Sequence, residues 1–307
     1  MAGTTLRLWL ERRHLISPHP GDRRRRLVVL LSAVLAMAFG AGVTLALTQP
    51  GEQPTTRPSG AAPATTALQV AAADRHQAAA WIAAQVGSNV IVGCDPEMCV
   101  ELQNSGFPAG QLKELQPSTP DPLGLVLVVA TPVIRNQFGA RLASVYAPLV
   151  IASFGSGTER VDIRYIAPDG SRAFEAQLVT DRKNRIAAGQ QLLANNHVQA
   201  SADARKALLA GQVDPRLLVT LGTLAGLMPI QLVAFDDPSP GASSDVPLRG
   251  AELGAGTSAG LPAMVAFLRA QQEQYAPAVT SIIQIANGQH VVTVRYAAPG
   301  PMGLEGS

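Results

Sequence analysis

The hydrophobic and polar positions divide the chain into three stretches. Residues 27–47, LVVLLSAVLAMAFGAGVTLAL, contain no charged side chain. As a helix with a rise of 1.5 Å per residue they would span about 31 Å, close to a hydrocarbon core of roughly 30 Å. Residues 48–66 are rich in Pro, Thr and Ala, a composition typical of an extended linker that buries no core. From residue 67 onward apolar patterns recur, and we expect the folded part there.

Within residues 67–198, segments with helical spacing alternate with short apolar runs. We expect helices over 68–86, 96–105, 135–146 and 171–194, and strands over 89–93, 123–130, 149–154 and 160–166. Asp95 precedes Pro96 and is the expected cap of the second helix. The run 123–130, LGLVLVVA, is continuously apolar, as in a sheet covered on both faces. This β-α-β order predicts an open α/β sheet with right-handed crossovers.

The order of expected helices and strands changes over residues 199–298. We expect helices over 201–210, 216–227 and 261–274, a strand over 230–235, a polar loop over 236–247, and a hairpin of 281–285 and 290–296. Asp214-Pro215 is the expected start of the second helix, and Asn287-Gly288 is the expected hairpin turn. We interpret this stretch as a smaller α+β domain and residues 299–307 as a tail. The predicted fold class is α/β: a single N-terminal transmembrane helix (27–47), an open α/β sheet domain (67–198) and the α+β domain (199–298).

Positive charge is concentrated before the apolar run. The chain has 24 Lys and Arg against 22 Asp and Glu, but residues 1–26 alone carry seven arginines, four of them at 23–26. The positive-inside bias therefore predicts a cytoplasmic tail over 1–26 and an extracytoplasmic body in a single-pass membrane protein. The body is slightly acidic, which argues against a nucleic-acid partner. The alternative is a cleaved signal peptide, which requires a shorter apolar region and a small-x-small site.

Two cysteines, Cys94 and Cys99, are the only ones in the chain, and both follow the predicted membrane span. In an oxidising compartment we expect them to form a short-loop disulfide that fixes the turn between a strand and a helix. The alternative is a pair of buried free thiols. A redox centre is disfavoured because its usual spacing is Cys-x-x-Cys.

Several short motifs in residues 78–166 match those of a known domain. They are Ala80-Trp81-Ile82, Cys94-Asp95, Gly106-Phe107-Pro108, Val128-Val129-Ala130-Thr131-Pro132 with Ile134-Arg135, and Val150-Ile151-Ala152-Ser153-Phe154-Gly155-Ser156-Gly157. With them, the segment resembles the extracytoplasmic soluble domain of some actinobacterial lipid-linked membrane glycosyltransferases. The catalytic acids of that family lie near its membrane helices. The resemblance therefore implies an α/β module that faces the cell wall, without transferase activity.

A second stretch, residues 212–296, resembles the fold shared by zinc DD-peptidases and Hedgehog-type domains. The similar segments are Gln212-Val213-Asp214-Pro215-Arg216-Leu217-Leu218 and Leu248-Arg249-Gly250-Ala251-Glu252-Leu253. Carried onto this chain, the zinc-ligand positions of that family fall on Asp245, Glu252 and His290. Two of the three depart from the His and Asp of the family pattern. Catalytic zinc usually takes two or three His nitrogens, whereas two carboxylates and one His would hold a harder cation, and only weakly. The resemblance therefore implies a degenerate peptidase-like domain, and we expect no metal and no cofactor.

These observations favour a non-catalytic protein of the cell envelope, anchored in the membrane by one helix, that binds a wall polymer or an envelope protein. The alternative is a metal-dependent peptidoglycan peptidase or amidase that uses Asp245, Glu252 and His290. A third hypothesis is a regulator that signals through the tail 1–26. Outside the predicted span no complete catalytic set of residues can be assembled from the sequence.

Overall fold

A computed structural model of the chain describes residues 62–257 and 259–301. The unit that extends from Ser59 to Ser307 contains both of the sheets described below. No helix within the described residues is long and apolar enough to cross a membrane. The predicted cytoplasmic tail 1–26 and membrane helix 27–47 lie outside the described residues, as does most of the predicted linker.

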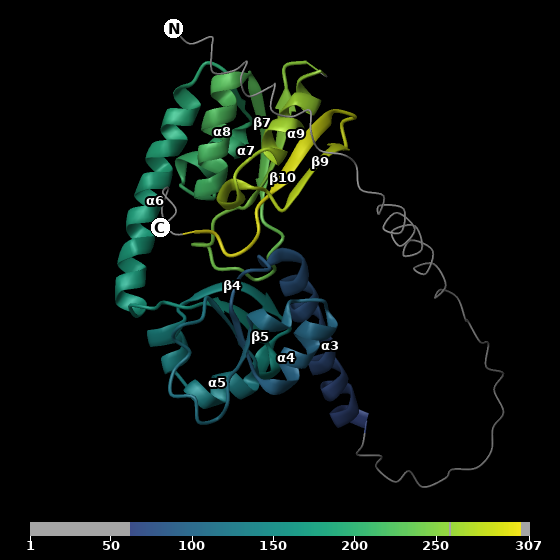
Figure 1. Ribbon diagram of the computed structural model, residues 1–307, viewed down its shortest axis with the longest axis vertical. Helices are drawn as coiled ribbons and strands as arrows, with labels where there is room; N and C mark the ends of the chain where they lie inside the picture. Colours follow the sequence, from purple (N-terminus) through teal and green to yellow (C-terminus); the bar gives the residue numbers. More distant parts are fainter. Residues whose placement is uncertain (1–61, 258, 302–307) are drawn as a thin grey trace, which may run out of the picture. The chain divides into compact units, whose positions relative to one another are not determined.

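The described residues form a mixed α/β fold with two five-stranded sheets (Figure 1). The helices are α3 (Ala62–Gln85), α4 (Pro96–Asn104), α5 (Pro132–Phe138), α6 (Ser171–Ala194), α7 (Ala202–Leu209), α8 (Pro215–Leu227) and α9 (Gly260–Arg269). The strands are β1 (Val92–Cys94), β2 (Leu112–Glu114), β3 (Leu127–Ala130), β4 (Leu149–Phe154), β5 (Val161–Tyr165), β6 (Val198–Ala200), β7 (Ile230–Asp236), β8 (Gly250–Ala255), β9 (Val279–Gln284) and β10 (His290–Arg295). The α/β class predicted from the sequence is confirmed at this level.

The first sheet has the strand order β2-β1-β3-β5-β4. Strand β1 runs parallel to both β2 and β3, whereas β5 runs antiparallel to β3 and to β4. Side chains of β3 alternate between two cores: Leu127 and Val129 contact the cluster that includes α3 and α4, and Val128 and Ala130 contact the cluster that includes α5. The continuous apolar run therefore marks a strand covered on both faces, as predicted.

The second sheet has the order β6-β7-β8-β10-β9. Only β6 and β7 are parallel; the remaining pairs are antiparallel. Buried side chains of α6, α7, α8 and α9 share one cluster with those of β7, β8 and β10, and Figure 1 shows α7 and α8 beside β7. The hairpin of β9 and β10 is confirmed, and Gly288 in its turn has a φ of 81°, a conformation that favours glycine.

Two segments of the second half connect it to the first half, one at the sheet and one at α3. The polar loop before β8 lies along the edge strand β4: the Ser153 amide donates to the Pro240 carbonyl at 2.7 Å, and the Ser243 amide donates to the Val150 carbonyl at 2.9 Å. The chain after β10 pairs with the end of α3, where Ala298 forms an isolated parallel bridge with Val86. Both halves of the described chain are therefore linked by backbone hydrogen bonds.

The sequence predictions of local structure differ from the observed elements in several places. The expected helix over 261–274 is shorter, because α9 ends at Arg269. The expected helix over 135–146 is divided, because Gly139 ends α5 with a φ of 56° and a separate π-helical turn covers Leu142–Tyr146. Helix α3 begins at Ala62, inside the predicted linker 48–66, since a proline is tolerated in the first turn of a helix. Strands β2, β6 and β8 were not predicted.

Candidate functional site

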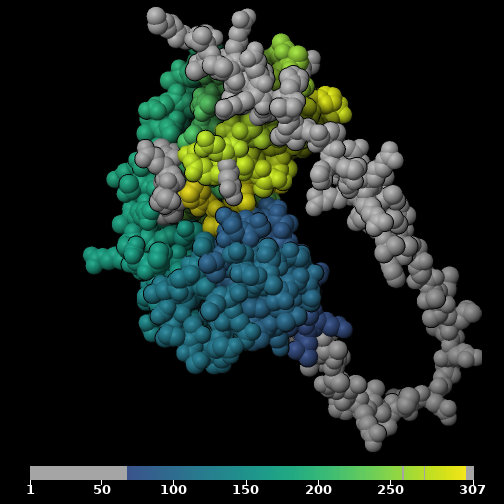
Figure 2. All heavy atoms as spheres, in the orientation of Figure 1, coloured from purple at the N-terminus to yellow at the C-terminus, as the bar shows by residue number. Residues whose placement is uncertain are grey.

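A groove of about 700 Å³ lies between segments from both halves of the described chain, and its volume falls in the range of ligand sites. Four segments line it together with Tyr165 at the end of β5: the end of α3 with the turn that follows, the start of α8, the residues before β9, and the chain after β10. The lining residues are 84–90, Tyr165, Pro215, Arg216, Gln274, Tyr275, Ala276, Ala278 and 297–301. Figure 2 shows yellow residues of the C-terminal segment at the surface next to blue residues of the first half.

Backbone pairing between distant segments forms one wall of this groove. The Ala298 amide donates to the Gln85 carbonyl at 2.7 Å, and the Gly87 amide donates to the Ala298 carbonyl at 2.9 Å. The first of these bonds satisfies a carbonyl that the end of α3 leaves without a partner in the helix. The turn after α3 and the C-terminal segment are therefore held side by side.

The start of α8 supplies the only charged side chain among the residues that line the groove. Asp214 is fully buried and caps α8 by accepting from the Arg216 amide at 2.8 Å, as the sequence predicted. Its carboxylate also binds the Arg216 guanidinium at 2.8 Å, and Arg216 donates to the Ala297 carbonyl at 2.9 Å. Arg216 is thereby fixed between the helix start and the C-terminal segment.

The ring of Tyr296 supports Arg216. The Arg216 guanidinium lies 4.9 Å from the centre of the Tyr296 ring, a cation–π contact. The Tyr296 hydroxyl lies 2.7 Å from the hydroxyl of Thr220 on α8. Burial raises the pKa of Tyr296 to about 12, so the phenol remains neutral at physiological pH.

The rest of the lining offers neutral hydrogen-bonding groups and two half-buried aromatic rings, those of Tyr165 and Tyr275. Gln85, Ser88, Asn89 and Gln274 supply amides and a hydroxyl. The lining residues include no His, Cys, Asp, Glu or Lys. Such a surface can bind a polar ligand through hydrogen bonds and ring contacts, and it lacks the paired base and nucleophile that covalent catalysis requires.

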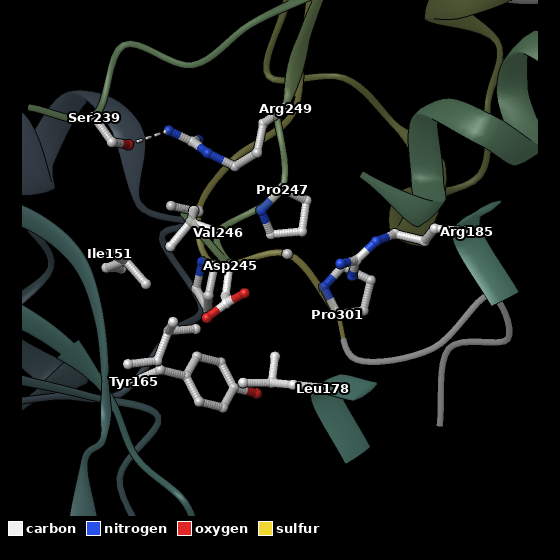
Figure 3. A pocket seen from close by; sticks show the side chains of 14 residues that line it. Ile151, Tyr165, Leu178, Arg185, Ser239, Asp245, Val246, Pro247, Arg249 and Pro301 are labelled. Carbon is white, nitrogen blue, oxygen red and sulfur yellow. Dashed lines mark hydrogen bonds between the residues drawn. The ribbon is translucent and has the colours of Figure 1, made fainter. Parts of the chain in front are cut away.

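A second hollow, a cavity of about 30 Å³, lies near the groove and shares Tyr165 and the C-terminal segment with it. Figure 3 shows Arg249 directed toward Ser239 and Arg185 beside Pro301, on different sides of Asp245. Arg249 is buried, and its guanidinium binds the Asp237 carboxylate at 2.9 Å and the Tyr296 carbonyl at 2.8 Å. The cavity has room for only one or two water molecules, so we assign it a structural role.

Two charged residues of α6 are buried. Arg185 is 5% exposed and donates to the Gly211 carbonyl at 2.8 Å, and Asp181 is 4% exposed. Burial lowers the pKa of the Arg185 guanidinium, and the nearby carboxylates of Asp181 and Asp214 oppose this shift. The helical pattern alone suggests a solvated face at these positions, because it does not show that the carbonyl of Gly211 is available to Arg185.

The structure does not bring together the three residues of the metal hypothesis. Asp245 lies in the loop before β8, where its carboxylate faces Arg182 at 3.5 Å. Glu252 is in β8 opposite Thr293 of β10, whereas His290 is three residues away on β10. Because side chains alternate along a strand, Glu252 and His290 extend from opposite faces of the sheet. Within the described residues, no group of three or more His, Cys, Asp or Glu side chains could hold a metal ion.

The predicted disulfide is present. Cys94 at the end of β1 is bonded to Cys99 on α4, with their Cα atoms 5.3 Å apart. Both cysteines are buried. The bond spans the turn at which Asp95 caps α4 by accepting from the Met98 amide at 3.0 Å, so the disulfide and the cap fix the same turn.

The groove residues were not identified from the sequence. The start of α8 was predicted correctly from Asp214-Pro215, yet nothing in the sequence connects Arg216 to Ala297 or Gln85 to Ala298. These contacts join residues more than 80 positions apart. The spacing of apolar residues within one segment cannot indicate which distant segment it pairs with.

Comparisons of the chain with protein-family models, with curated proteins and with solved structures find no match. The two family resemblances therefore remain expectations from the sequence.

Proposed function

We propose that this chain is a non-catalytic binding protein of the cell envelope, tethered by the helix predicted over residues 27–47, whose groove takes an amide-bearing fragment of the cell wall. The groove beside Tyr275 carries this proposal. Its volume of about 700 Å³ suits a short peptide or an N-acetylated sugar. Its amide side chains match the donors and acceptors of such ligands, and Tyr275 offers a ring against which a sugar or a peptide plane can lie.

The disulfide between Cys94 and Cys99 supports the extracytoplasmic part of the proposal, because such bonds persist mainly in oxidising compartments. The orientation is tested by adding a protease to intact cells. We expect the part of the chain after residue 66 to be trimmed while a tag at residue 1 remains protected. Full protection of the C-terminal part in intact cells would overturn the proposed localisation.

Binding is tested with the full chain in detergent and with soluble muropeptides from digested peptidoglycan, by titration calorimetry. We expect saturable binding that Tyr275→Ala and Gln274→Ala each weaken about tenfold, the effect of about 1.4 kcal/mol of lost contact. Gln272→Ala is the matched control, because Gln272 is exposed and lies near Tyr275 without lining the groove. Absence of binding would reject the ligand class, and equal binding by all three variants would reject the groove as the site.

The metal-dependent alternative has its own test. Metal analysis of the purified chain should find no stoichiometric zinc. We expect none because Glu252 and His290 extend from opposite faces of the sheet and share no site. Bound zinc that disappears in Glu252→Ala would contradict the non-catalytic proposal.

A further inference from the structure

The two sheets end in four edge strands, β2, β4, β6 and β9. An exposed edge presents unpaired amides and carbonyls that can pair with another chain, and proteins protect most edges with charges, short strands or covering segments. Strand β2 has three residues and carries Lys113 and Glu114, and β6 also has only three residues. Strand β4 is covered by the loop that bonds to Ser153 and Val150. Three of the four edges are therefore protected.

Strand β9 differs from the other three. Its six residues, VTSIIQ, contain no charge and no proline. Val279, Ile282 and Ile283 are 41%, 43% and 38% exposed. Ile282 and Ile283 are consecutive, so their side chains extend from opposite faces of the sheet. This edge thus presents apolar side chains on both faces.

The direction of the backbone groups of β9 follows from the turn next to it. The Ile285 amide donates to the Gln289 carbonyl at 2.9 Å, so residue 285 faces β10. In an antiparallel pair this direction alternates, and the amides and carbonyls of Thr280, Ile282 and Gln284 therefore face away from β10. The Arg269 side chain confirms this direction, because it reaches the Thr280 carbonyl at 3.3 Å. The groups of Ile282 and Gln284 lie on the open side of the sheet.

We propose that β9 pairs with β9 of a second copy of this chain, antiparallel and about a two-fold axis, so that the second sheets of two copies become continuous. An antiparallel pair of identical strands is self-complementary, since every contact occurs twice. The absence of charge on β9 removes like-charge opposition across the axis. A charged partner strand, by contrast, would find no complementary charge on β9.

The surroundings of β9 fit the same arrangement. A two-fold axis through the middle of β9 places the two Arg269 side chains at opposite ends of the paired strands. Each would then lie near Gln284 of the other copy, whose side-chain oxygen can accept a hydrogen bond. Pairing also covers Ile282 and Ile283, which are exposed in the single chain.

The test measures the mass of the full chain in detergent by light scattering and sedimentation, over a range of protein concentrations. We expect a concentration-dependent dimer and at least a tenfold weaker association for Ile282→Lys, which places two charges near the axis. Gln272→Lys adds the same charge outside the strand and should dimerise like the unchanged protein. Gln284→Pro removes one outward amide, leaves the side facing β10 intact, and should weaken association as well.

Hydrogen exchange distinguishes loss of the dimer from loss of the fold. In the dimer the amides of Ile282 and Gln284 should exchange slowly, and in Ile282→Lys they should exchange rapidly while that of Ile283, which faces β10, remains protected. A chain that is monomeric at every concentration would overturn the proposal. So would a dimer that persists in both Ile282→Lys and Gln284→Pro, because a surface other than β9 would then hold it together.

Discussion

The hydroxyl of Thr131 donates a hydrogen bond to the carboxylate of Asp95 and so joins the N-caps of two helices. Asp95 follows β1 and Thr131 follows β3, two adjacent parallel strands. From β1 the chain goes to β2 on one side, while β3 lies on the other, and open α/β sheets commonly bind ligands at such a point. Here Asp95 is 3% exposed and Thr131 is 1% exposed. The protein's own polar pair therefore fills this position, and the groove lies elsewhere.

The first prediction concerns Asp95. Asp95→Ala removes the cap of α4 and leaves the buried Thr131 hydroxyl without its acceptor, so we expect the free energy of unfolding to fall by about 2 kcal/mol. Urea denaturation monitored by circular dichroism measures this loss. Asn104→Ala is the control, because Asn104 is exposed at the other end of the same helix. A loss no greater than that of the control would contradict a role for the cap pair.

The second prediction concerns the disulfide. Closing the short loop between Cys94 and Cys99, which are five positions apart, restricts the unfolded chain, and the loop-entropy relation gives about 2 kcal/mol of stabilisation. Adding a strong reductant should lower the urea midpoint by the corresponding amount. The double variant Cys94→Ala with Cys99→Ala should have the lower midpoint already and should not respond to the reductant. If the urea midpoint of the double variant also fell, the effect of the reductant would not come from breaking the Cys94–Cys99 bond.

Local signals predicted much of the fold. Helices α4 and α8 begin where Asp95 and Asp214 predicted, and the β9–β10 hairpin turns at Asn287-Gly288. Each of these signals acts over a few residues: a side chain that caps an amide, a proline in a first turn, or a glycine at positive φ. Such interactions are determined by neighbours in the sequence, so they can be recognised without the structure.

Strand β8 could not be predicted in this way. Its sequence, GAELGA, has two glycines and no β-branched residue, so its intrinsic preference for a strand is low. It becomes a strand because β7 and β10 pair with it on both sides. The groove depends on the same kind of distant pairing, between Gln85 and Ala298. The groove therefore could not be predicted from local sequence patterns, whereas the helix cap at Asp214, which supports it, could.

The third prediction concerns the loop that covers β4. Gly241 has a φ of 61°, and a Cβ atom there would lie 2.8 Å from the Ser153 side chain. Gly241→Ala should therefore cost about 1–2 kcal/mol of unfolding free energy, through backbone strain and displacement of the loop. Hydrogen exchange should show faster exchange of the Ser153 amide, which donates to Pro240.

The same substitution at Gly222 should have the opposite sign. Gly222 is exposed within α8, and nothing lies within 4 Å of the place its Cβ would occupy. Gly222→Ala should raise the unfolding free energy by roughly 0.5–1 kcal/mol, because alanine favours a helix. If Gly241→Ala were neutral or stabilising like this control, the close fit of the loop against Ser153 would be wrong.

The last prediction concerns the dependence of stability on alkaline pH. The pKa of Tyr296 is raised from 10 to about 12 by burial in the folded chain. Between these values the unfolded chain releases the phenol proton and the folded chain retains it, so the folded state binds more protons. Stability due to Tyr296 is therefore complete below pH 10 and falls as the pH rises toward 12, by about 3 kcal/mol in total.

Urea denaturation in steps from neutral to alkaline pH, with tyrosinate absorbance recorded in parallel, measures this dependence. Tyr296→Phe should lose stability at neutral pH, because the bond to Thr220 is absent, but its decline above pH 10 should be shallower. Burial also raises the pKa of Tyr165, so the decline that remains in Tyr296→Phe should decrease further when Tyr165→Phe is added. Equal alkaline slopes for Tyr296→Phe and the unchanged chain would mean that Tyr296 titrates normally in the folded state, and the ring beneath Arg216 would then have to be open to water.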